Sequence, residues 1–300
     1  MNTAKKLKAV SYGEVLWDVF ADGKKIGGAP LNLALRMQSL GCDVAMISCV
    51  GNDADGDEII GYVNAQGLDT GGIMRNEAYP TGLVQVYVNE RGSASYEISY
   101  PSAWDKIQLT DYARSLVADA DVLIYGSLVC RDTVSKISLE ELLKNDVYKV
   151  FDVNLRPPHY TQAVIEDLMK TASFIKFNDE ELLEIAAGMG SPYTLLEENM
   201  EFIANKTKTR SMCVTKGKHG AVLMWEGNLY NNNGYPVKVA DTVGAGDSFL
   251  ATLIMGLLTG RDPQQAINYA CAVGALVAAS AGANPQLKEE DIEALMLSVE

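Results

Sequence analysis

Short apolar runs alternate with amphipathic segments along most of this chain. Six runs predict strands, at residues 8–12, 44–50, 121–125, 149–152, 174–177 and 212–215. Several of them are continuously apolar, which is typical of a parallel sheet that is covered on both faces.

Segments with helical periodicity separate these strands. They cover residues 31–40, 57–66, 133–143, 162–170, 180–187 and 195–206. Gly41 and Gly67 directly follow the first two, where a glycine often ends a helix. Two further helices, rich in Gly and Ala, are predicted at residues 247–258 and 263–280. Because strands and helices alternate, we predict an α/β fold built from βαβ units.

Two regions break this alternation. Residues 83–89 and 94–100 alternate apolar with polar positions, and Glu90-Arg91-Gly92-Ser93 lies between them, which predicts a hairpin. Residues 15–26, with Asp22-Gly23 at their centre, are a candidate for a further part of the same small sheet. Residues 221–225 and 228–231 predict a second hairpin. A hairpin outside the parallel sheet indicates a small β lid.

The charge of the chain limits its partners. The 300 residues have a formal net charge of −14 and contain no run rich in Lys and Arg. This composition argues against a nucleic acid or an anionic membrane surface as a partner, because both need a basic surface. The most apolar runs, residues 249–258 and 270–281, are shorter than the ~20 residues of a membrane-spanning helix.

The cysteines and histidines point to a protein of the reducing cytosol without a histidine metal site. The five cysteines lie at positions 42, 49, 130, 213 and 271, and none forms a CxxC pair. Most stand in apolar runs, where a free cysteine behaves as a small hydrophobic residue, so we expect a cytoplasmic protein. The two histidines, His159 and His219, are far apart in sequence.

The strongest candidate for chemistry is Asp241-Thr242-Val243-Gly244-Ala245-Gly246-Asp247. A Gly-x-Gly turn leads into an apolar helix, whose first amides have no partners inside the helix and favour an anionic oxygen. Asp247 could accept the proton of a hydroxyl group while these amides stabilise a phosphoryl group. Beside the helix dipole we expect Asp247 to ionise readily, and hence to be a weak base.

Two other interpretations of this segment are open. Asp247 could simply be the N-cap of the helix, a position that favours Asp. Gly244-Ala245-Gly246 also begins a dinucleotide fingerprint, but Phe249 stands where the third glycine belongs. The phosphate loop GxxxxGK[ST] is absent, since Gly217-Lys218-His219 does not complete it.

The chain resembles the ribokinase-like (PfkB) family of carbohydrate kinases over nearly its whole length. The family's C-terminal signature D-T-x-G-A-G-D is matched at residues 241–247. Its N-terminal signature is matched by Gly27, Gly28 and Asn32, followed by residues 51–56. The resemblance implies a single domain over residues 1–300, with a three-layer α/β/α architecture and a mostly parallel central sheet. It also implies a small β lid formed from about residues 15–27 and 81–103.

The resemblance implies catalytic roles for the matching residues. Asp247 matches the base that deprotonates the sugar hydroxyl. The amides of Gly244, Ala245 and Gly246 match the anion hole that holds the migrating phosphoryl group. Arg156, the last residue of a D-x-N-x-R segment, matches a side chain near the transferred phosphate and the sugar.

Two further sets of residues match substrate contacts of the family. The sugar contacts are matched by Asp18, Gly28, Asn32, Asp152, Asn154 and Asp247. The contacts to ATP are matched by Asn178, Thr215, Gly217, Gly220, Val243, Gly246 and Cys271.

Two cation sites are also implied by the resemblance. Asn178 and Glu181 match an N-x-x-E element that organises Mg²⁺ and phosphate through water, although Asn178 is equally a good N-cap for the helix that follows it. Asp241, with backbone carbonyls around Thr242 and residues 280–283, resembles the monovalent-cation site of many members. The expected cofactors are therefore ATP and Mg²⁺, with K⁺ as a third candidate.

The segment Gly27-Gly28-Ala29-Pro30-Leu31-Asn32 is similar to the form found in fructokinases. The leading prediction is therefore an ATP-dependent fructokinase that forms D-fructose 6-phosphate. The alternatives are a kinase of the same family for 2-keto-3-deoxygluconate, ribose or a nucleoside, a catalytically silent sugar-binding regulator, and a nicotinamide dehydrogenase. Exposed strand edges in the β lid favour pairing with a second copy, which would give a homodimer through the lid.

Overall fold

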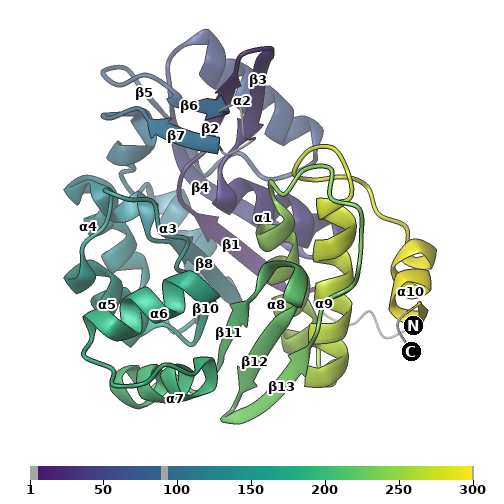
Figure 1. Cartoon of the computed structure of the whole chain (residues 1–300). Helices are drawn as coiled ribbons and strands as arrows, with labels where there is room; N and C mark the ends of the chain where they lie inside the picture. Colours follow the sequence, from purple (N-terminus) through teal and green to yellow (C-terminus); the bar gives the residue numbers. More distant parts are fainter. Residues whose placement is uncertain (1–5, 89–93, 299–300) are drawn as a thin grey trace.

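The structure, a computed structural model, describes residues 6–88 and 94–298. A nine-stranded sheet runs through the molecule in the order β13-β12-β11-β10-β9-β8-β1-β4-β5. Its strands pair in parallel from β5 to β11, and the antiparallel hairpin of β12 and β13 completes one edge. Helices cover both faces of this sheet (Figure 1). The predicted α/β/α architecture is confirmed.

All six predicted strands of the main sheet are present. The sheet consists of β1 (Lys8–Tyr12), β4 (Asp43–Gly51), β5 (Ile73–Asn76), β8 (Val122–Gly126), β9 (Tyr148–Asp152), β10 (Phe174–Asn178), β11 (Met212–Thr215), β12 (Ala221–Trp225) and β13 (Asn228–Asn232). β5 was not predicted, because Arg75 and Asn76 occupy half of its four positions and no apolar run marks it.

Two helical layers bury the two faces of the sheet. One layer contains α1 (Ala29–Ser39), α2 (Ala54–Ala65), α8 (Ala245–Leu258), α9 (Pro263–Ala278) and α10 (Glu289–Leu297). The other contains α3 (Asp111–Ala118), α4 (Thr133–Leu142), α5 (Gln162–Thr171), α6 (Asp179–Gly188) and α7 (Leu196–Thr207). Ala9 belongs to the first apolar cluster and the next residue, Val10, to the second. This alternation is what a strand covered on both faces requires.

Local capping decides where two important helices begin. Asp53 caps α2 by accepting the amide of Gly56 at 2.8 Å, so that helix begins at Ala54, three residues before the predicted start. Gly244, with φ +76°, is the N-cap of α8, and the helix begins at Ala245. Asp247 therefore lies inside the first turn of α8, and the interpretation of Asp247 as a mere N-cap is wrong.

A second, four-stranded sheet has the order β3-β2-β6-β7 and corresponds to the predicted β lid. It consists of β2 (Leu16–Phe20), β3 (Gly23–Gly27), β6 (Gly82–Val88) and β7 (Ala94–Ile98). Figure 1 shows it at one end of the molecule, beyond β4 and α1. The turn predicted at residues 90–93 lies outside the described residues. Tyr96 of β7 is 57% exposed, and pairing of this sheet with a second copy stays a prediction.

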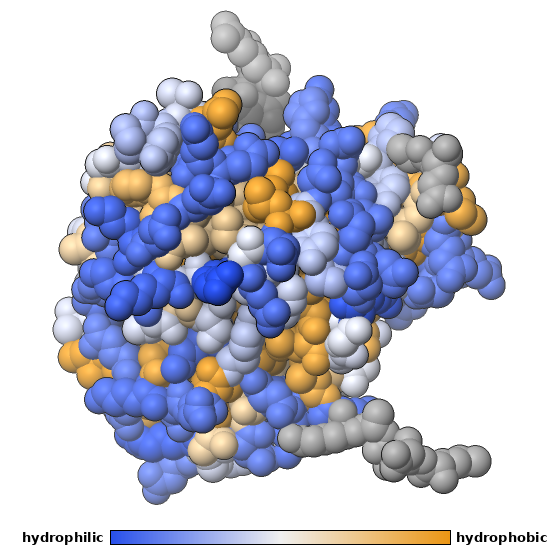
Figure 2. All heavy atoms as spheres, turned by 90° about the horizontal axis from the view of Figure 1, so that it is seen from below, coloured by the Kyte–Doolittle hydropathy of each residue, from blue (hydrophilic) through white to orange (hydrophobic). Residues whose placement is uncertain are grey.

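Hydrophilic side chains predominate on the face of the molecule in Figure 2, where apolar residues form small scattered patches. Within residues 6–88 and 94–298, no helix combines the length and the apolar character needed to cross a bilayer. The five cysteines are all buried and free of disulfides, which agrees with their interpretation as hydrophobic core residues.

Candidate active site

The candidate site lies at the carboxyl ends of the central parallel strands. β1 pairs with β4 on one side and with β8 on the other, so the strand order reverses there. In open α/β sheets a crevice forms beyond the strand ends at such a reversal. Glu14 follows β1, Asn154 and Arg156 follow β9, and Asn178 ends β10. The topology thus brings together residues that are far apart in sequence.

Asp247 is half-buried in the first turn of α8, and its Oδ2 accepts a hydrogen bond of 2.9 Å from Asn32 Nδ2. Burial raises the pKa of Asp247 to about 6, and the nearby carboxylate of Asp152 adds to this rise. The hydrogen bond from Asn32 and the positive charges of Lys176 and Arg156 oppose it. The expectation that Asp247 is a weak base is therefore wrong: burial and Asp152 raise its pKa, and Asp247 is a stronger base than an exposed Asp.

The turn before α8 needs glycine at position 244. A Cβ atom on Gly244 would lie 2.5 Å from the carbonyl oxygen of Ala283. The amide of Ala245 donates to the carbonyl of Thr242 at 3.3 Å, whereas the amides of Gly246 and Asp247 have no backbone partner among the described residues. The amide of Gly244 likewise has no backbone partner among the described residues. Two of the three amides assigned to the anion hole, those of Gly244 and Gly246, are therefore open, and the amide of Asp247 joins them.

Lys176 is a residue of this site that the sequence analysis did not assign. It lies in β10, is 7% exposed, and its Nζ lies 3.1 Å from Asp152 Oδ1. A Cβ atom on Gly246 would lie 3.8 Å from the same Nζ, so the ammonium group faces the first turn of α8. Burial lowers the pKa of Lys176, but the carboxylates of Asp152 and Glu181 outweigh it and raise that pKa overall. A lysine inside an otherwise apolar strand was the available signal.

Asn178 and Glu181 form a capping box at the start of α6. Asn178 Oδ1 accepts the amide of Glu181 at 2.8 Å, and Glu181 Oε2 accepts the amide of Asn178 at 2.8 Å. Glu181 Oε1 accepts the amide of Leu155 at 2.9 Å. The N-cap interpretation of Asn178 is thus confirmed, and both oxygens of Glu181 already hold backbone amides. The described ranges contain no cluster of three or more His, Cys, Asp or Glu side chains that could hold a metal ion.

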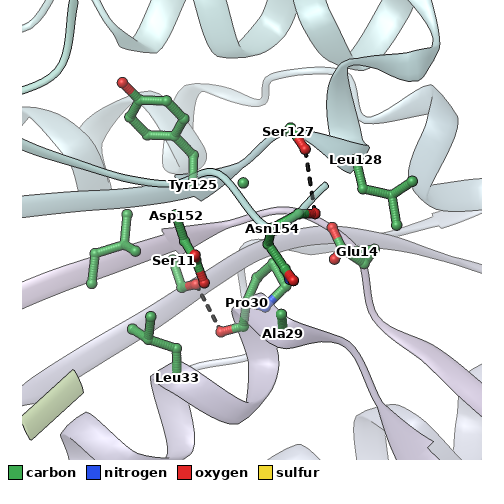
Figure 3. A pocket seen from close by; sticks show the side chains of 12 residues that line it. Ser11, Glu14, Ala29, Pro30, Leu33, Tyr125, Ser127, Leu128, Asp152 and Asn154 are labelled. Atoms are coloured by element: carbon green, nitrogen blue, oxygen red, sulfur yellow. Dashed lines mark hydrogen bonds between the residues drawn. The ribbon is translucent and has the colours of Figure 1, made fainter. Parts of the chain in front are cut away.

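Glu14 is a second residue that the sequence analysis left without a role. It is 4% exposed, and its Oε2 has no hydrogen-bond partner within the described part of the chain. Burial raises its pKa to about 7, while the backbone and the Arg156 cation act to lower it. Figure 3 shows Glu14 with Ser127, Asp152 and Asn154 around a small cavity of about 10 Å³. That volume suits a single water molecule.

The predicted sugar contacts Asp18 and Gly28 approach the same region from the second sheet and from α1. Burial raises the pKa of Asp18 to about 6, against the opposing charges of Arg156 and Lys25. Gly28, with φ +114°, lies so close to the chain that a Cβ atom there would be 2.5 Å from the carbonyl oxygen of Glu14. Arg156 acts on the pKa of Glu14, Asp18 and Asp247, so its charge lies among all three carboxyl groups.

A larger cavity of about 620 Å³ borders the turn before α8 and the start of that helix. Five of the residues assigned to ATP line it: Thr215, Gly217, Gly220, Gly246 and Cys271. Two others, Asn178 and Val243, do not line it. The side chain of Asn178 is engaged in capping α6, and Val243 points outward from its turn with 39% of its surface exposed.

Asp241, the residue assigned to a monovalent cation, helps to shape the same turn. Its Oδ1 accepts the amide of Val243 at 3.0 Å, and its own amide donates to the carbonyl of Ala278 at 3.2 Å. These bonds join the turn to the end of α9. The cation itself stays a prediction.

Comparison with known proteins identifies the family. The family model for pfkB family carbohydrate kinases matches residues 2–290. A sugar kinase of Pyrococcus horikoshii is 30% identical over 282 residues, which cover 89% of this chain and 85% of the relative. The crystal structure of an uncharacterized sugar kinase from that organism in complex with ATP superposes with a TM-score of 0.83 at 27% identity, over 95% of this chain and 99% of that one.

Two further relatives differ in the sugar that they are named for. A probable fructokinase-5 of Arabidopsis thaliana is 26% identical, over 96% of this chain and 97% of the relative. A 2-dehydro-3-deoxygluconokinase of Thermoproteus tenax is 24% identical, over 97% of this chain and 92% of the relative. The match of the family model over almost the whole length, together with these relatives, shows that the chain belongs to the PfkB family of carbohydrate kinases and is a phosphotransferase that acts on a sugar.

Proposed function

We propose that this protein is an ATP-dependent fructokinase, which converts ATP and D-fructose to ADP and D-fructose 6-phosphate. One observation carries the proposal: a partly exposed carboxyl group, Asp247, adjoins open backbone amides at the border of a cavity large enough for a nucleotide. Phosphoryl transfer requires mainly positioning and charge stabilisation, and this arrangement can provide both.

In the proposed mechanism Asp247 accepts the proton of the primary hydroxyl as that oxygen attacks the γ-phosphorus. A pKa of about 6 leaves Asp247 ionised at neutral pH and still basic enough to take a proton late in the reaction. The amides of Gly246 and Asp247 would hold the oxygens of the migrating phosphoryl group, and the Lys176 ammonium group would neutralise part of its charge.

The residues around the larger cavity fit a nucleotide. Gly217, Gly220 and Gly274 allow the backbone to approach a ligand, and Phe249 and Cys271 add apolar surface. The P. horikoshii sugar kinase, whose crystal structure contains ATP, supports ATP as the phosphoryl donor. Glu181, both of whose oxygens accept backbone amides, would hold Mg²⁺ through water, and the ion would offset part of the phosphate charge. Asp241 and nearby carbonyls remain our candidate site for K⁺.

The charges of the site favour a neutral sugar over a sugar acid. Four carboxyl groups surround the expected position of the acceptor, those of Glu14, Asp18, Asp152 and Asp247, against the cations of Arg156 and Lys176. A ligand such as 2-keto-3-deoxygluconate would bring a further negative charge into this partly buried region, which costs free energy. The fructokinase-like segment at residues 27–32 and the Arabidopsis relative point the same way.

A sugar panel tests the proposal. ADP release is measured with ATP and Mg²⁺ against D-fructose, 2-keto-3-deoxygluconate, D-ribose and a nucleoside, with and without K⁺. We expect kcat/KM for D-fructose to exceed that for each other acceptor by on the order of 100-fold, because a site built to bind several hydroxyl groups rejects analogues that lack them. A higher kcat/KM for 2-keto-3-deoxygluconate would replace fructose by that sugar acid, and ATP-independent chemistry would refute the kinase mechanism.

A further inference from the structure

Two amide side chains connect the loop after α9 with Asp247. Asn284 Nδ2 donates to Asn32 Oδ1 at 3.0 Å, and Asn32 Nδ2 donates to Asp247 Oδ2 at 2.9 Å. Asn284 belongs to the segment Gly282-Ala283-Asn284-Pro285, and Asn32 lies in the first turn of α1. Asn32, which donates to Asp247, therefore accepts a hydrogen bond itself from Asn284, a residue 252 positions away along the chain.

The direction of both hydrogen bonds is determined by chemistry. An ionised carboxylate can only accept, so Asn32 must turn its Nδ2 toward Asp247. Its Oδ1 then faces the loop and needs a donor, which Asn284 provides. Asn284 Oδ1 is buried and has no hydrogen-bond partner within residues 6–88 and 94–298. A buried unpaired acceptor is costly. The side chain of Asn284 is therefore oriented by its hydrogen bond to Asn32, although this orientation leaves its own Oδ1 without a partner.

The loop that carries Asn284 is held firmly on both sides. Arg36 of α1 is 5% exposed; its guanidinium group donates to the carbonyl of Pro285 at 2.9 Å and to Ser248 Oγ at 3.1 Å. Ala283 packs against Gly244, where an added Cβ atom would lie 2.6 Å from the Ala283 side chain. The same short segment therefore contacts α1 and the turn before α8, and Arg36 connects it to the first turn of α8.

We propose that Asn284 is a positioning residue, which keeps the amide of Asn32 turned toward Asp247 and thereby favours the ionised form of that carboxyl group. Asn284 acts through Asn32, and its own contacts lie outside the sugar and nucleotide positions proposed above. The inference rests on the proposed role of Asp247 as the general base.

Other charged groups also act on Asp247 and must be kept constant in a test. They approach it from β9, from the segment after β9, from β10 and from the segment after β1: Asp152, Arg156, Lys176 and Glu14. Asn284 lies beyond this set, on the opposite side of Asn32. It also lines a separate cavity of about 570 Å³, which leaves room for a changed side chain at position 284.

The test is the pH dependence of kcat and kcat/KM for Asn284→Asp and Asn284→Ala in the full-length protein. An aspartate at 284 accepts instead of donates, so Asn32 is expected to turn its amide nitrogen away from Asp247. Turnover should then require a higher pH: the acidic limb of both profiles moves upward by about 1 pH unit in N284D and by about 0.5 unit in N284A. At pH 8.5, where Asp247 is ionised in every variant, kcat should recover to within a few-fold of the wild-type value.

A matched control separates this effect from added charge. Gln286 is exposed on the same loop, and Gln286→Asp adds the same negative charge without touching Asn32. We expect Q286D to leave the acidic limb in place.

If the limb is unchanged in N284D and N284A while Asp247→Asn is inactive, the positioning role is refuted and the proposed function stands. If Asp247→Asn keeps its turnover, the proposed function itself fails. If N284D does not fold, the acidic limbs of N284A and Q286D are compared instead. A lower melting temperature of N284A together with an unchanged acidic limb would then refute the proposal.

Discussion

The cavity of about 620 Å³ and the centre around Asp247 border the same turn but are built in opposite ways. Glycines, backbone turns and small apolar side chains line the cavity, and its basic residues, Lys218 and His219, are exposed. Around Asp247, charged groups are buried against one another, as in the pair of Asp152 and Lys176, which are 5% and 7% exposed. A substitution in the cavity should therefore change mainly the affinity for the ligand. A substitution around Asp247 should do more than that, because each desolvated charge depends on its neighbours.

The most severe way to break the centre is Asp247→Asn. The amide keeps the shape but cannot accept the hydroxyl proton, so we expect kcat to fall by about 10³-fold, within the range of a lost general base. Calorimetry should show that fructose and ATP still bind. The exposed Glu201 of α7 provides the control, and E201Q should behave as the wild type.

The same carboxyl group predicts the pH dependence of the wild type. Below about pH 6, where Asp247 becomes protonated, kcat should fall tenfold for each pH unit.

Lys176→Met should come next, and it should damage stability as well as turnover. The substitution leaves Asp152 and Glu181 buried without their cation, which typically costs about 3–5 kcal/mol in the free energy of unfolding. We also expect a loss of about 100-fold in kcat, because the phosphoryl group loses one cation. Urea unfolding and ADP release measure the two effects. Lys170→Met, at an exposed position of α5, should show neither, and a stable, fully active K176M would contradict the assignment.

A substitution in the cavity should separate binding from chemistry. Ala275 lines the cavity from α9, and Ala275→Leu places extra volume there. We expect the KM for ATP to rise by about 10-fold, with kcat and the KM for fructose within a factor of two, as when only ground-state binding is lost. Gln265→Leu, at an exposed position on the same helix, is the control. An equal loss of kcat would mean that the cavity takes part in the chemistry.

Glu14→Gln should have the smallest effect on turnover. In contrast to Lys176→Met, it should stabilise the folded protein. The pKa of Glu14 rises from 4.5 in the unfolded chain to about 7 in the folded protein. The folded state thus holds this proton more tightly, so the stability that Glu14 contributes is complete below pH 4.5 and is lost as the pH rises through 7. At pH 8 E14Q should be more stable than the wild type by on the order of 1–3 kcal/mol.

The same pair of proteins provides the internal control for this prediction. The difference between E14Q and the wild type in urea unfolding should disappear at pH 4, where Glu14 is protonated in both states of the wild type. An equal gain at pH 4 and pH 8 would show that the substitution acts through packing instead of through charge.

The sequence by itself determined the framework. Periods of apolar residues gave the main strands and helices, the break in that rhythm gave the second sheet, and Gly244 and Gly246 marked the turn before Asp247, because these features depend on neighbours within a few residues. Three short elements were not predicted: β5 has four residues, half of them polar, and α3 and α10 have only eight and nine residues.

Only the tertiary structure decided the chemistry of the site. Contacts with segments that are distant in sequence give three residues their roles: Lys176, Glu14 and Asn284. No local sequence pattern predicts such contacts. The pKa of Asp247 was expected to be low from the helix dipole alone, but burial and Asp152 raise it. Proton affinity depends on desolvation and on the charges that the fold brings near, and both exist only once the chain has folded.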